Sequence, residues 1–477
     1  MLTRPTLRVP SLAGALLLSL AACGPSTSPS PTPGPGASAA GSIGPLGQVD
    51  AAGIQADLEA LEAIAEENGG VRTAGTTGYE ASVDYVAGEL RQLGYAVQTP
   101  AFEMATFAEE PGATIAIAGG ASFDAGPDFH AMIYSSSGDL SGRIAEVGYG
   151  DDERGGCSAS DFADFPRGAI ALAPPGNCFR RDAVVNAVDA GAVAFIVAYP
   201  QWSTGAVRRP TLLFPEGIEI PALSASAEVG EALRAAAVAR RQVTISVHTD
   251  IGTAVVRNVI AESHGVADHV VMLGGHLDSV HDGPGINDNA SGSAALLGVA
   301  RVVAAKHPSV RVRFAFWAGE EFALLGSQDY VASLRPAEQA EITAYLNFDM
   351  LGSANYVPFV YDAPSAALGS KQIADFLVSY LEDAGIGAEP TDLGGSSDHA
   401  SFDALGIPTG GIFTGATEMK SDAQAAKFGG TADAPMDACY HLACDTVANV
   451  NVDMVAEFAQ AALALAVAIA SGQLQLN

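Results

Sequence analysis

Two histidines and a set of carboxylates follow short apolar runs in the second half of this chain. His276 and Asp278 come directly after the run at residues 270–273, and Asp288 lies in the glycine-rich, acid-rich loop that follows. The other candidates are Glu320 and Glu321 after residues 314–317, Asp349 after residues 345–348, and His441 between Cys439 and Cys444. If these side chains converge, a cation must neutralise them, because packing so many carboxylates together without one would be very costly.

The donor types indicate which cation would bind. Imidazole with carboxylate suits zinc, and manganese or cobalt could also bind. The set is larger than one tetrahedral zinc needs, so two metal ions bridged by a carboxylate fit it better. Taken singly, each residue has an ordinary explanation: His276 as a packed histidine, Glu320 and Glu321 as a solvated turn, and Asp349 as a helix cap. The joint arrangement favours the metal site.

Alternating strand and helix patterns must position these residues. Strand-like runs lie at residues 255–261, 270–273, 310–317 and 342–348, and helical patterns follow Asp288 and occupy residues 323–334. This alternation predicts an α/β fold with a mixed central β-sheet flanked by helices. In such sheets ligands bind beyond the carboxyl ends of the strands, which is where every acidic motif here lies.

The sequence pattern changes at residues 124–248 and indicates an inserted domain. They contain short strand-like runs, many turns and one helical pattern at residues 181–190, so we expect a mainly-β or α+β module. Histidines and acids do not cluster there at ligand spacing, so the insert is expected to lack chemistry of its own. The surrounding parts, residues 49–123 and 249–477, are expected to form one catalytic domain.

The N-terminal sequence is typical of export. Arginines precede a short apolar stretch that is too short to span a bilayer. The small residues before Cys23 are similar to a bacterial lipobox, so residues 1–23 are expected to be a lipoprotein signal peptide with Cys23 lipidated. The alternative is an ordinary secretory signal, with Cys23 discarded or unpaired. Residues 24–48 are rich in Ser, Pro and Gly, and we expect them to form a disordered tether.

Charge limits the expected partners. The net charge is −31, from 54 acids against 23 bases, which argues against nucleic acid and anionic lipid. The charge is compatible with a secreted protein or with one tolerant of salt and does not decide between them. We expect a monomer, exported on the evidence of the N-terminal sequence and either anchored at the cell surface through the lipid on Cys23 or released. Residues 459–470 are apolar but short, which predicts a packed helix.

The cysteine count agrees with export. The chain has five cysteines, and four remain if Cys23 is lipidated. An even remainder in an exported protein suggests two disulfides. Cys439 and Cys444 lie close in sequence and are expected to close a tight loop, which leaves Cys157 and Cys178 to pair by elimination.

Longer motifs surround the candidate residues. They are His276-Leu-Asp278-Ser-Val, Gly285-Ile-Asn-Asp288-Asn-Ala-Ser-Gly-Ser, Ala318-Gly319-Glu320-Glu321, Asn347-Phe-Asp349-Met, Ser397-Asp398-His399, Cys439-Tyr440-His441-x-x-Cys444-Asp445 and, near the front, Asn68-Gly69-Gly70-Val-Arg72. Together they resemble the di-zinc aminopeptidases of the aminopeptidase S and aminopeptidase Y type. The resemblance implies a zinc exopeptidase-like, phosphorylase/hydrolase-like α/β fold. The insert, through the sequence around Cys157, Arg167-Gly168-Ala169-Ile170 and Cys178, resembles the protease-associated domain.

The resemblance also implies a set of metal ligands. His276 and Asp349 would bind one zinc ion, Glu321 and His441 would bind the other, and Asp288 would bridge the two. The cofactor would therefore be two Zn²⁺ per chain, and the substrates would be peptides with a free N-terminus.

The remaining residues would act around these ions. Asp278 would accept the other ring proton of His276 and fix its tautomer, and the peptide bond after Asp288 would be cis. Glu320 would be the general base for a water bridging the two zinc ions, and Tyr440 would hydrogen-bond the oxyanion. The implied function is an exported metalloaminopeptidase that hydrolyses the N-terminal peptide bond.

Other interpretations stay open. A carboxypeptidase or a glutaminyl cyclase on the same metal scaffold is one alternative, and an inactive surface binding protein is another. The chain has Ser396 where family members often carry an arginine, which concerns substrate orientation more than hydrolysis. Residues 397–399 could suggest a serine nucleophile, but Ser-Asp-His adjacent in sequence does not make a triad in space.

Overall fold

The computed structural model describes residues 46–150, 154–199, 207–265, 269–306, 311–392 and 394–476. The expected signal peptide, its Cys23 and nearly all of the expected tether lie outside the described residues.

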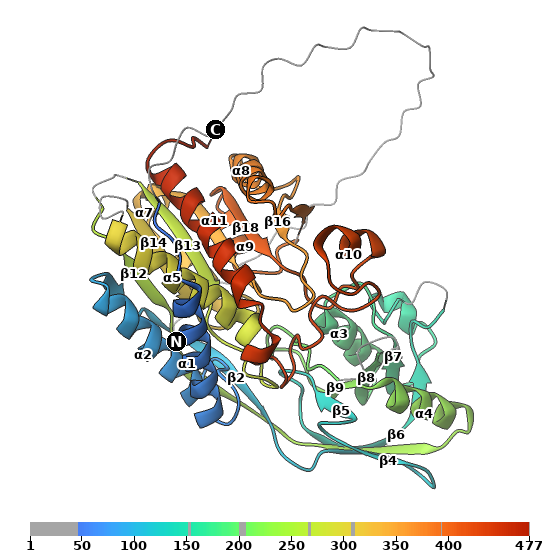
Figure 1. Ribbon diagram of the computed structural model, residues 1–477. Helices are drawn as coiled ribbons and strands as arrows, with labels where there is room; N and C mark the ends of the chain where they lie inside the picture. Colours follow the sequence, from blue (N-terminus) through green and yellow to red (C-terminus); the bar gives the residue numbers. More distant parts are fainter. Residues whose placement is uncertain are drawn as a thin grey trace, which may run out of the picture. The chain divides into compact units, whose positions relative to one another are not determined.

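The main sheet has eight strands in the order β1-β12-β14-β13-β15-β18-β16-β17. Their bounds are β1 (Ala96–Gln98), β12 (Val259–Glu262), β14 (Val312–Trp317), β13 (Val270–His276), β15 (Ile342–Phe348), β18 (Thr409–Phe413), β16 (Phe359–Tyr361) and β17 (Glu389–Thr391). Strand β13 lies between β14 and β15 and runs parallel to both, whereas β1–β12, β12–β14 and β16–β18 are antiparallel pairs. The predicted mixed sheet is confirmed (Figure 1).

Helices cover both faces of this sheet (Figure 1). One face carries α1 (Ala51–Glu67), α2 (Thr77–Gln92), α5 (Ser291–Lys306), α8 (Ser370–Asp383) and α11 (Val452–Ala470); the other carries α6 (Leu325–Ser333) and α9 (His399–Asp403). A hydrophobic core lies on each face of the sheet. Because side chains alternate along a strand, Leu273 of β13 packs in the core on the α5 face, whereas its neighbour Met272 packs with Trp317 and Tyr345 in the core on the α6 face. Two further short helices are α7 (Pro336–Glu341) and α10 (Asp422–Phe428).

Helix α11 explains the apolar run near the C-terminus. Among the described residues it is the one helix long and apolar enough to cross a membrane, but 72% of its apolar window is buried inside the protein. It packs against α1, α5 and α8, so the expected packed helix is confirmed.

The insert forms a second eight-stranded sheet in the order β4-β3-β10-β6-β7-β8-β9-β5. The bounds are β3 (Thr114–Ile117), β4 (Ser122–Asp124), β5 (Phe129–Ala131), β6 (Gly138–Glu146), β7 (Ile170–Ala173), β8 (Ala194–Ala198), β9 (Ala222–Ala225) and β10 (Gln242–Val247), with helices α3 (Arg180–Ala190) and α4 (Ala227–Val238). The predicted disulfide between Cys157 and Cys178 is formed here.

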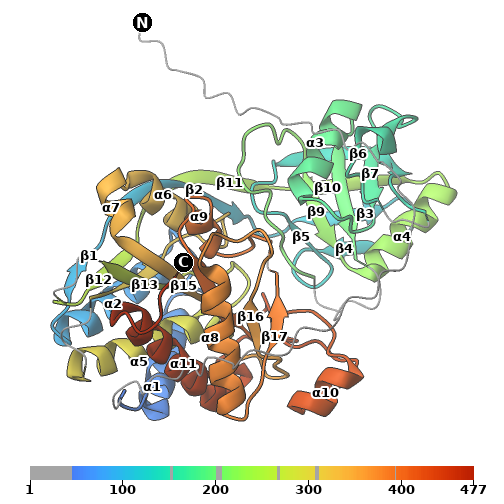
Figure 2. The ribbon, with the colours of Figure 1, turned by 90° about the horizontal axis from the view of Figure 1, so that it is seen from above.

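This second sheet begins earlier in the chain than expected. Strand β3 pairs with β10, and β4 pairs with β3, so residues from Thr114 onward belong with the insert rather than with the catalytic part, which was expected to extend to residue 123. Strands β2 (Ala101–Glu109) and β11 (Thr249–Arg257) pair along their full length as an antiparallel ribbon that leads into and out of the insert (Figure 2).

Candidate active site

Three parallel strands bring predicted ligands to one edge of the main sheet. His276 ends β13 and pairs in register with Trp317, which ends the neighbouring strand β14. Glu320 and Glu321 follow β14, and Asp349 directly follows β15 on the other side of β13. Parallel pairing therefore places these side chains together beyond the carboxyl ends of the strands, as expected for this class of sheet.

Asp288 lies at the centre of the cluster. It belongs to the irregular turn at Ile286–Ala290 that precedes α5, and the peptide bond between Asp288 and Asn289 is cis, as the resemblance implied. Its Oδ1 lies 3.1 Å from His276 Nε2, and its Oδ2 lies 3.0 Å from His441 Nε2. The two oxygens of one carboxylate thus face two different histidines.

Two further carboxylates complete the cluster. Asp349 Oδ1 lies 3.4 Å from His276 Nε2, and Glu321 Oε1 lies 3.1 Å from His441 Nε2. The ligand atoms of His276, Asp288 and Asp349 all lie within 4.8 Å of one another, and so do those of Asp288, Glu321 and His441. All five predicted metal ligands are therefore brought together as two groups that share Asp288.

The donor set fits divalent cations. Glu321 Oε1 and Asp349 Oδ1 are buried and accept no hydrogen bond, and only 1% of His276 and 5% of Asp288 is exposed. Buried carboxylate oxygens without donors are costly unless a cation neutralises them. Nitrogen and oxygen donors of this kind, three to each group with one shared, match two zinc-type ions.

Glu320 stands beside the two groups and belongs to neither. Its ligand atom lies within 4.8 Å of those of His276 and Glu321, and its backbone N–H donates to Asp278 Oδ1 at 3.2 Å. Burial raises the pKa of the Glu320 carboxyl well above its usual range, and the neighbouring carboxylate of Glu321 adds to this rise. Glu320 is thus a carboxyl group with a strong tendency to take up a proton.

Asp278 offers two acceptors to the ring of His276. His276 Nδ1 lies 3.0 Å from the backbone carbonyl of Asp278, whereas the Asp278 carboxylate is 3.6 Å away. That carboxylate also accepts the backbone N–H of Glu320. The nearer partner of this ring nitrogen is thus the Asp278 carbonyl, and acceptance of the ring proton by the Asp278 carboxylate stays a prediction.

His441 is presented by a small disulfide loop. The predicted Cys439–Cys444 disulfide is formed. The Tyr440 ring stacks on the His441 ring, with centroids 3.8 Å apart. Burial raises the pKa of Tyr440 well above its usual range, and the nearby carboxylates of Asp288 and Glu321 raise it further. Tyr440 therefore keeps its hydroxyl proton beside the cluster.

Sequence reasoning did not assign the residues that hold the ligands in place. Arg72 is fully buried and donates to the carbonyls of Leu277, Pro284 and Gly285, in the loop between His276 and Asp288. Its sequence signal was its place in the Asn-Gly-Gly-Val-Arg motif near the front of the chain.

Two more motif residues have the same kind of role. The Asp445 carboxylate accepts the backbone N–H groups of Asn287 and Asp288 at 2.8 and 3.1 Å. Ser397 Oγ donates to Asp349 Oδ2 at 2.7 Å. Ser397 therefore orients a predicted metal ligand, and its hydrogen bond does not go to the adjacent histidine as a serine nucleophile would require.

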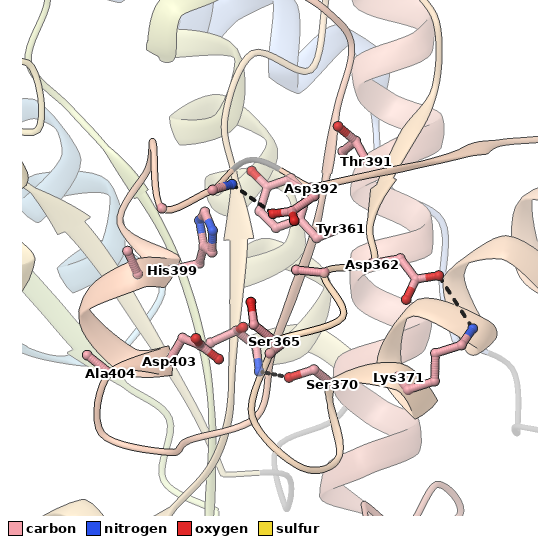
Figure 3. Close-up of a pocket in the computed structure, with 16 residues that line it drawn as sticks. Tyr361, Asp362, Ser365, Ser370, Lys371, Thr391, Asp392, His399, Asp403 and Ala404 are labelled. Carbon is pink, nitrogen blue, oxygen red and sulfur yellow. Dashed lines mark hydrogen bonds and ion pairs between the residues drawn. The ribbon is translucent and has the colours of Figure 1, made fainter. Parts of the chain in front are cut away.

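A cavity of about 300 Å³ lies between β16, α8 and α9 (Figure 3). It is lined by Tyr361, His399, three aspartates and Lys371 among others, and none of the five predicted metal ligands lines it. Hydrogen bonds connect it to the cluster: Asn347 donates to the Tyr361 hydroxyl at 3.2 Å and to Ser397, and Ser397 donates to Asp349.

The fold and the cluster together define a class of protein. A mixed α/β sheet with a histidine and carboxylate cluster at its carboxyl edge, interrupted by an α+β insert, defines an α/β protein with a candidate metal centre where this class of sheet binds ligands. Residues 258–466 match the profile of peptidase family M28, and residues 140–233 match that of the PA domain. The chain belongs to peptidase family M28 and carries a protease-associated insert.

Relatives and solved structures agree with this assignment. The chain is 39% identical over 417 residues to an aminopeptidase of Pseudomonas aeruginosa, covering 83% of this chain and 76% of the relative. It is 40% identical over 415 residues to the probable lipoprotein aminopeptidase LpqL of Mycobacterium tuberculosis, covering 83% and 80%. The structure of an aminopeptidase from Aneurinibacillus is similar with a TM-score of 0.71 at 25% identity, covering 89% of this chain and 94% of that one.

Proposed function

We propose that this chain is an exported aminopeptidase that uses two zinc ions to hydrolyse the N-terminal peptide bond of peptides. The observation that carries the proposal is the sharing of Asp288 between two ligand groups, each with its own histidine. The relatives named as aminopeptidases support the choice of substrate end.

The five clustered residues would hold the ions. His276 and Asp349 would hold one ion, Glu321 and His441 would hold the other, and Asp288 would be shared by the two groups. When bound, two such ions polarise the carbonyl of the scissile bond and lower the pKa of an attacking water.

Protein groups carry out the proton transfers. Glu320 accepts the proton of the attacking water and passes it to the leaving amine, a role that suits a carboxyl whose pKa is raised by burial. The Tyr440 hydroxyl donates to the carbonyl oxygen as negative charge develops on it. The free α-amino group of the substrate faces Glu320 and Asp349, and this charge pairing restricts cleavage to the N-terminus.

Export and domain organisation belong to the same proposal. The lipobox-like sequence at Cys23, the name of the Mycobacterium relative and the two disulfides all support an exported lipoprotein. The pairing of β3 with β10, and of β4 with β3, supports an insert that begins near Thr114 and ends at residue 248.

Hydrolysis of Leu-p-nitroanilide with and without 1,10-phenanthroline tests the proposal. The activity is expected to be lost on chelation and restored by zinc. Glu320→Gln should retain both zinc ions and lower kcat by about 10²–10⁴-fold, whereas the same change at the exposed Glu231 of α4 should leave kcat unchanged. Release that is insensitive to the chelator would refute the metal mechanism, and full activity of the Glu320 variant would refute the assigned base.

A further inference from the structure

Two adjacent arginines of the insert, Arg208 and Arg209, reach the catalytic domain. They lie between β8 and β9. The sequence predicted an insert without chemistry of its own, yet both side chains contact the loops that carry the metal-binding residues.

Arg209 fixes this point of the insert in place. Its guanidinium bonds both carboxylate oxygens of Asp282, at 3.0 and 3.1 Å, and the Glu109 carboxylate at 2.6 Å. It also donates to the carbonyl of Ala131 at 2.8 Å. Only 9% of the Arg209 side chain is exposed. Asp282 lies in the loop between His276 and Asp288, so the backbone at residues 208–209 is tied to the catalytic domain.

Arg208 uses this fixed backbone to contact the disulfide loop. Its Nε donates to the backbone carbonyl of Tyr440 at 3.1 Å, and its guanidinium carbon lies 5.8 Å from the centroid of the Tyr440 ring. The Arg208 carbonyl in turn accepts a hydrogen bond from Ser224 Oγ of β9. Hydrogen bonds therefore hold both the guanidinium and the backbone carbonyl of Arg208.

The carbonyl of Tyr440 belongs to the peptide group that leads into His441. His441 has φ = 60°, a left-handed backbone conformation that residues other than glycine rarely adopt. Rotation of that peptide group toward an ordinary conformation would swing the imidazole away from Asp288 and Glu321. The disulfide closes the loop, but a hydrogen bond to this carbonyl is what fixes the direction of the peptide group.

We propose that Arg208 is a positioning residue, supplied by the protease-associated insert, that holds the Tyr440–His441 peptide group in the orientation needed for metal binding and for the Tyr440 hydroxyl. This inference rests on the proposed function for its effect on catalysis, but its effect on metal binding does not depend on which substrate is cleaved.

The test compares Arg208→Met and Arg208→Lys in the full chain with Arg234→Met as a matched control. Arg234 is also an insert arginine, with its guanidinium over the Tyr149 ring at 4.7 Å and a bond to Glu146, but it lies on α4. Each protein is loaded with two equivalents of zinc and titrated with a chelator of known affinity. Kinetics with Leu-p-nitroanilide are measured in parallel at saturating zinc.

Arg208→Met is expected to bind one of the two zinc ions about 10- to 100-fold more weakly, as is typical when a group that orients a ligand is lost. Its kcat should fall while KM stays unchanged. Arg208→Lys keeps a donor within reach of the carbonyl, so it should recover part of both losses. Arg234→Met should match the wild type in both measurements.

Equal zinc affinity in Arg208→Met and Arg234→Met would overturn the inference. If Arg208→Met fails to fold by circular dichroism, Arg208→Ser decides the question, because its shorter side chain cannot reach the Tyr440 carbonyl and wild-type zinc affinity and kcat in that variant would leave no role for the hydrogen bond. A wild type that binds two zinc ions but releases no nitroaniline would instead refute the proposed function, and the zinc comparison would still test Arg208.

Discussion

Replacing Arg72 by methionine should destabilise the catalytic domain more than any surface change. The guanidinium is fully buried and donates to three backbone carbonyls, at 2.9, 2.5 and 2.6 Å. Methionine keeps most of the volume of the side chain but supplies no donor. Each buried carbonyl left without a partner costs about 1–3 kcal/mol, so the three together should lower the free energy of unfolding by about 3–9 kcal/mol. That is a large share of the roughly 5–15 kcal/mol that stabilises a typical domain.

Arg181→Met is the matched control. Arg181 also donates to two backbone carbonyls, those of Phe214 and Glu216, but it does so at the surface of the insert. Water can replace the arginine there, so the expected loss is below about 1 kcal/mol. The comparison separates the effect of burial from that of losing an arginine.

Urea unfolding followed by tryptophan fluorescence measures the difference, because Trp317 is fully buried at the end of β14. The experiment is done in EDTA, so that zinc binding adds nothing to the stability of either variant. A loss for Arg72→Met no larger than that for Arg181→Met would refute the reasoning. Arg72→Lys, with a single compact donor group, should fall between methionine and the wild type.

Two further predictions concern the disulfides and a buried histidine. Replacing Cys439 and Cys444 should lower the free energy of unfolding by about 2 kcal/mol, and replacing Cys157 and Cys178, whose disulfide closes a longer loop, should lower it by about 3 kcal/mol. Only loss of the Cys439–Cys444 disulfide should weaken zinc binding in a chelator titration, and equal zinc affinity in both double variants would contradict this. His281 is packed edge-on between aromatic rings, and burial, with the charge of a neighbouring arginine, lowers its pKa to about 4. In the unfolded chain His281 has an ordinary pKa near 6.5 and binds a proton that the folded chain does not, so the protein loses stability as pH falls from about 6.5 toward 4. The free energy of unfolding of His281→Phe, measured in urea, should therefore rise by about 2 kcal/mol relative to that of the wild type on going from pH 7.5 to pH 5. Parallel pH profiles of the two proteins would refute the prediction.

The sequence predicts the main sheet well because its signals are local. The alternation of apolar runs and helical patterns identifies parallel strands, and parallel neighbours end at the same edge, so side chains such as His276 and Asp349 must meet there. Spacing within a short loop is equally local, which is why the Cys439–Cys444 pair could be predicted. The family motifs then supply the correct set of clustered residues without any knowledge of distance.

What the sequence could not predict depends on contacts between distant segments. Strand β3 lies within residues 49–123, yet it pairs with β10 of the insert, and no local sequence signal indicates that contact. Arg208 lies 232 positions from Tyr440, and nothing near either residue indicates the contact. Sequence also cannot tell which oxygen of Asp278 lies nearer to His276 Nδ1. The backbone carbonyl is 3.0 Å away and the carboxylate 3.6 Å, a difference of only 0.6 Å.

A common principle connects the residues that sequence reasoning left unassigned. Four of the five clustered ligands have a partner that is not itself a predicted metal ligand. His276 is held by the carbonyl of Asp278, Asp288 through Asp445, Asp349 by Ser397, and the peptide group before His441 by Arg208. Five polar groups at close range repel or rearrange unless such partners fix them, because a loosely held carboxylate gains by turning toward water. The partners come from both domains, so the insert is part of what keeps the cluster in shape. Loss of a partner should therefore alter metal affinity before it alters the fold.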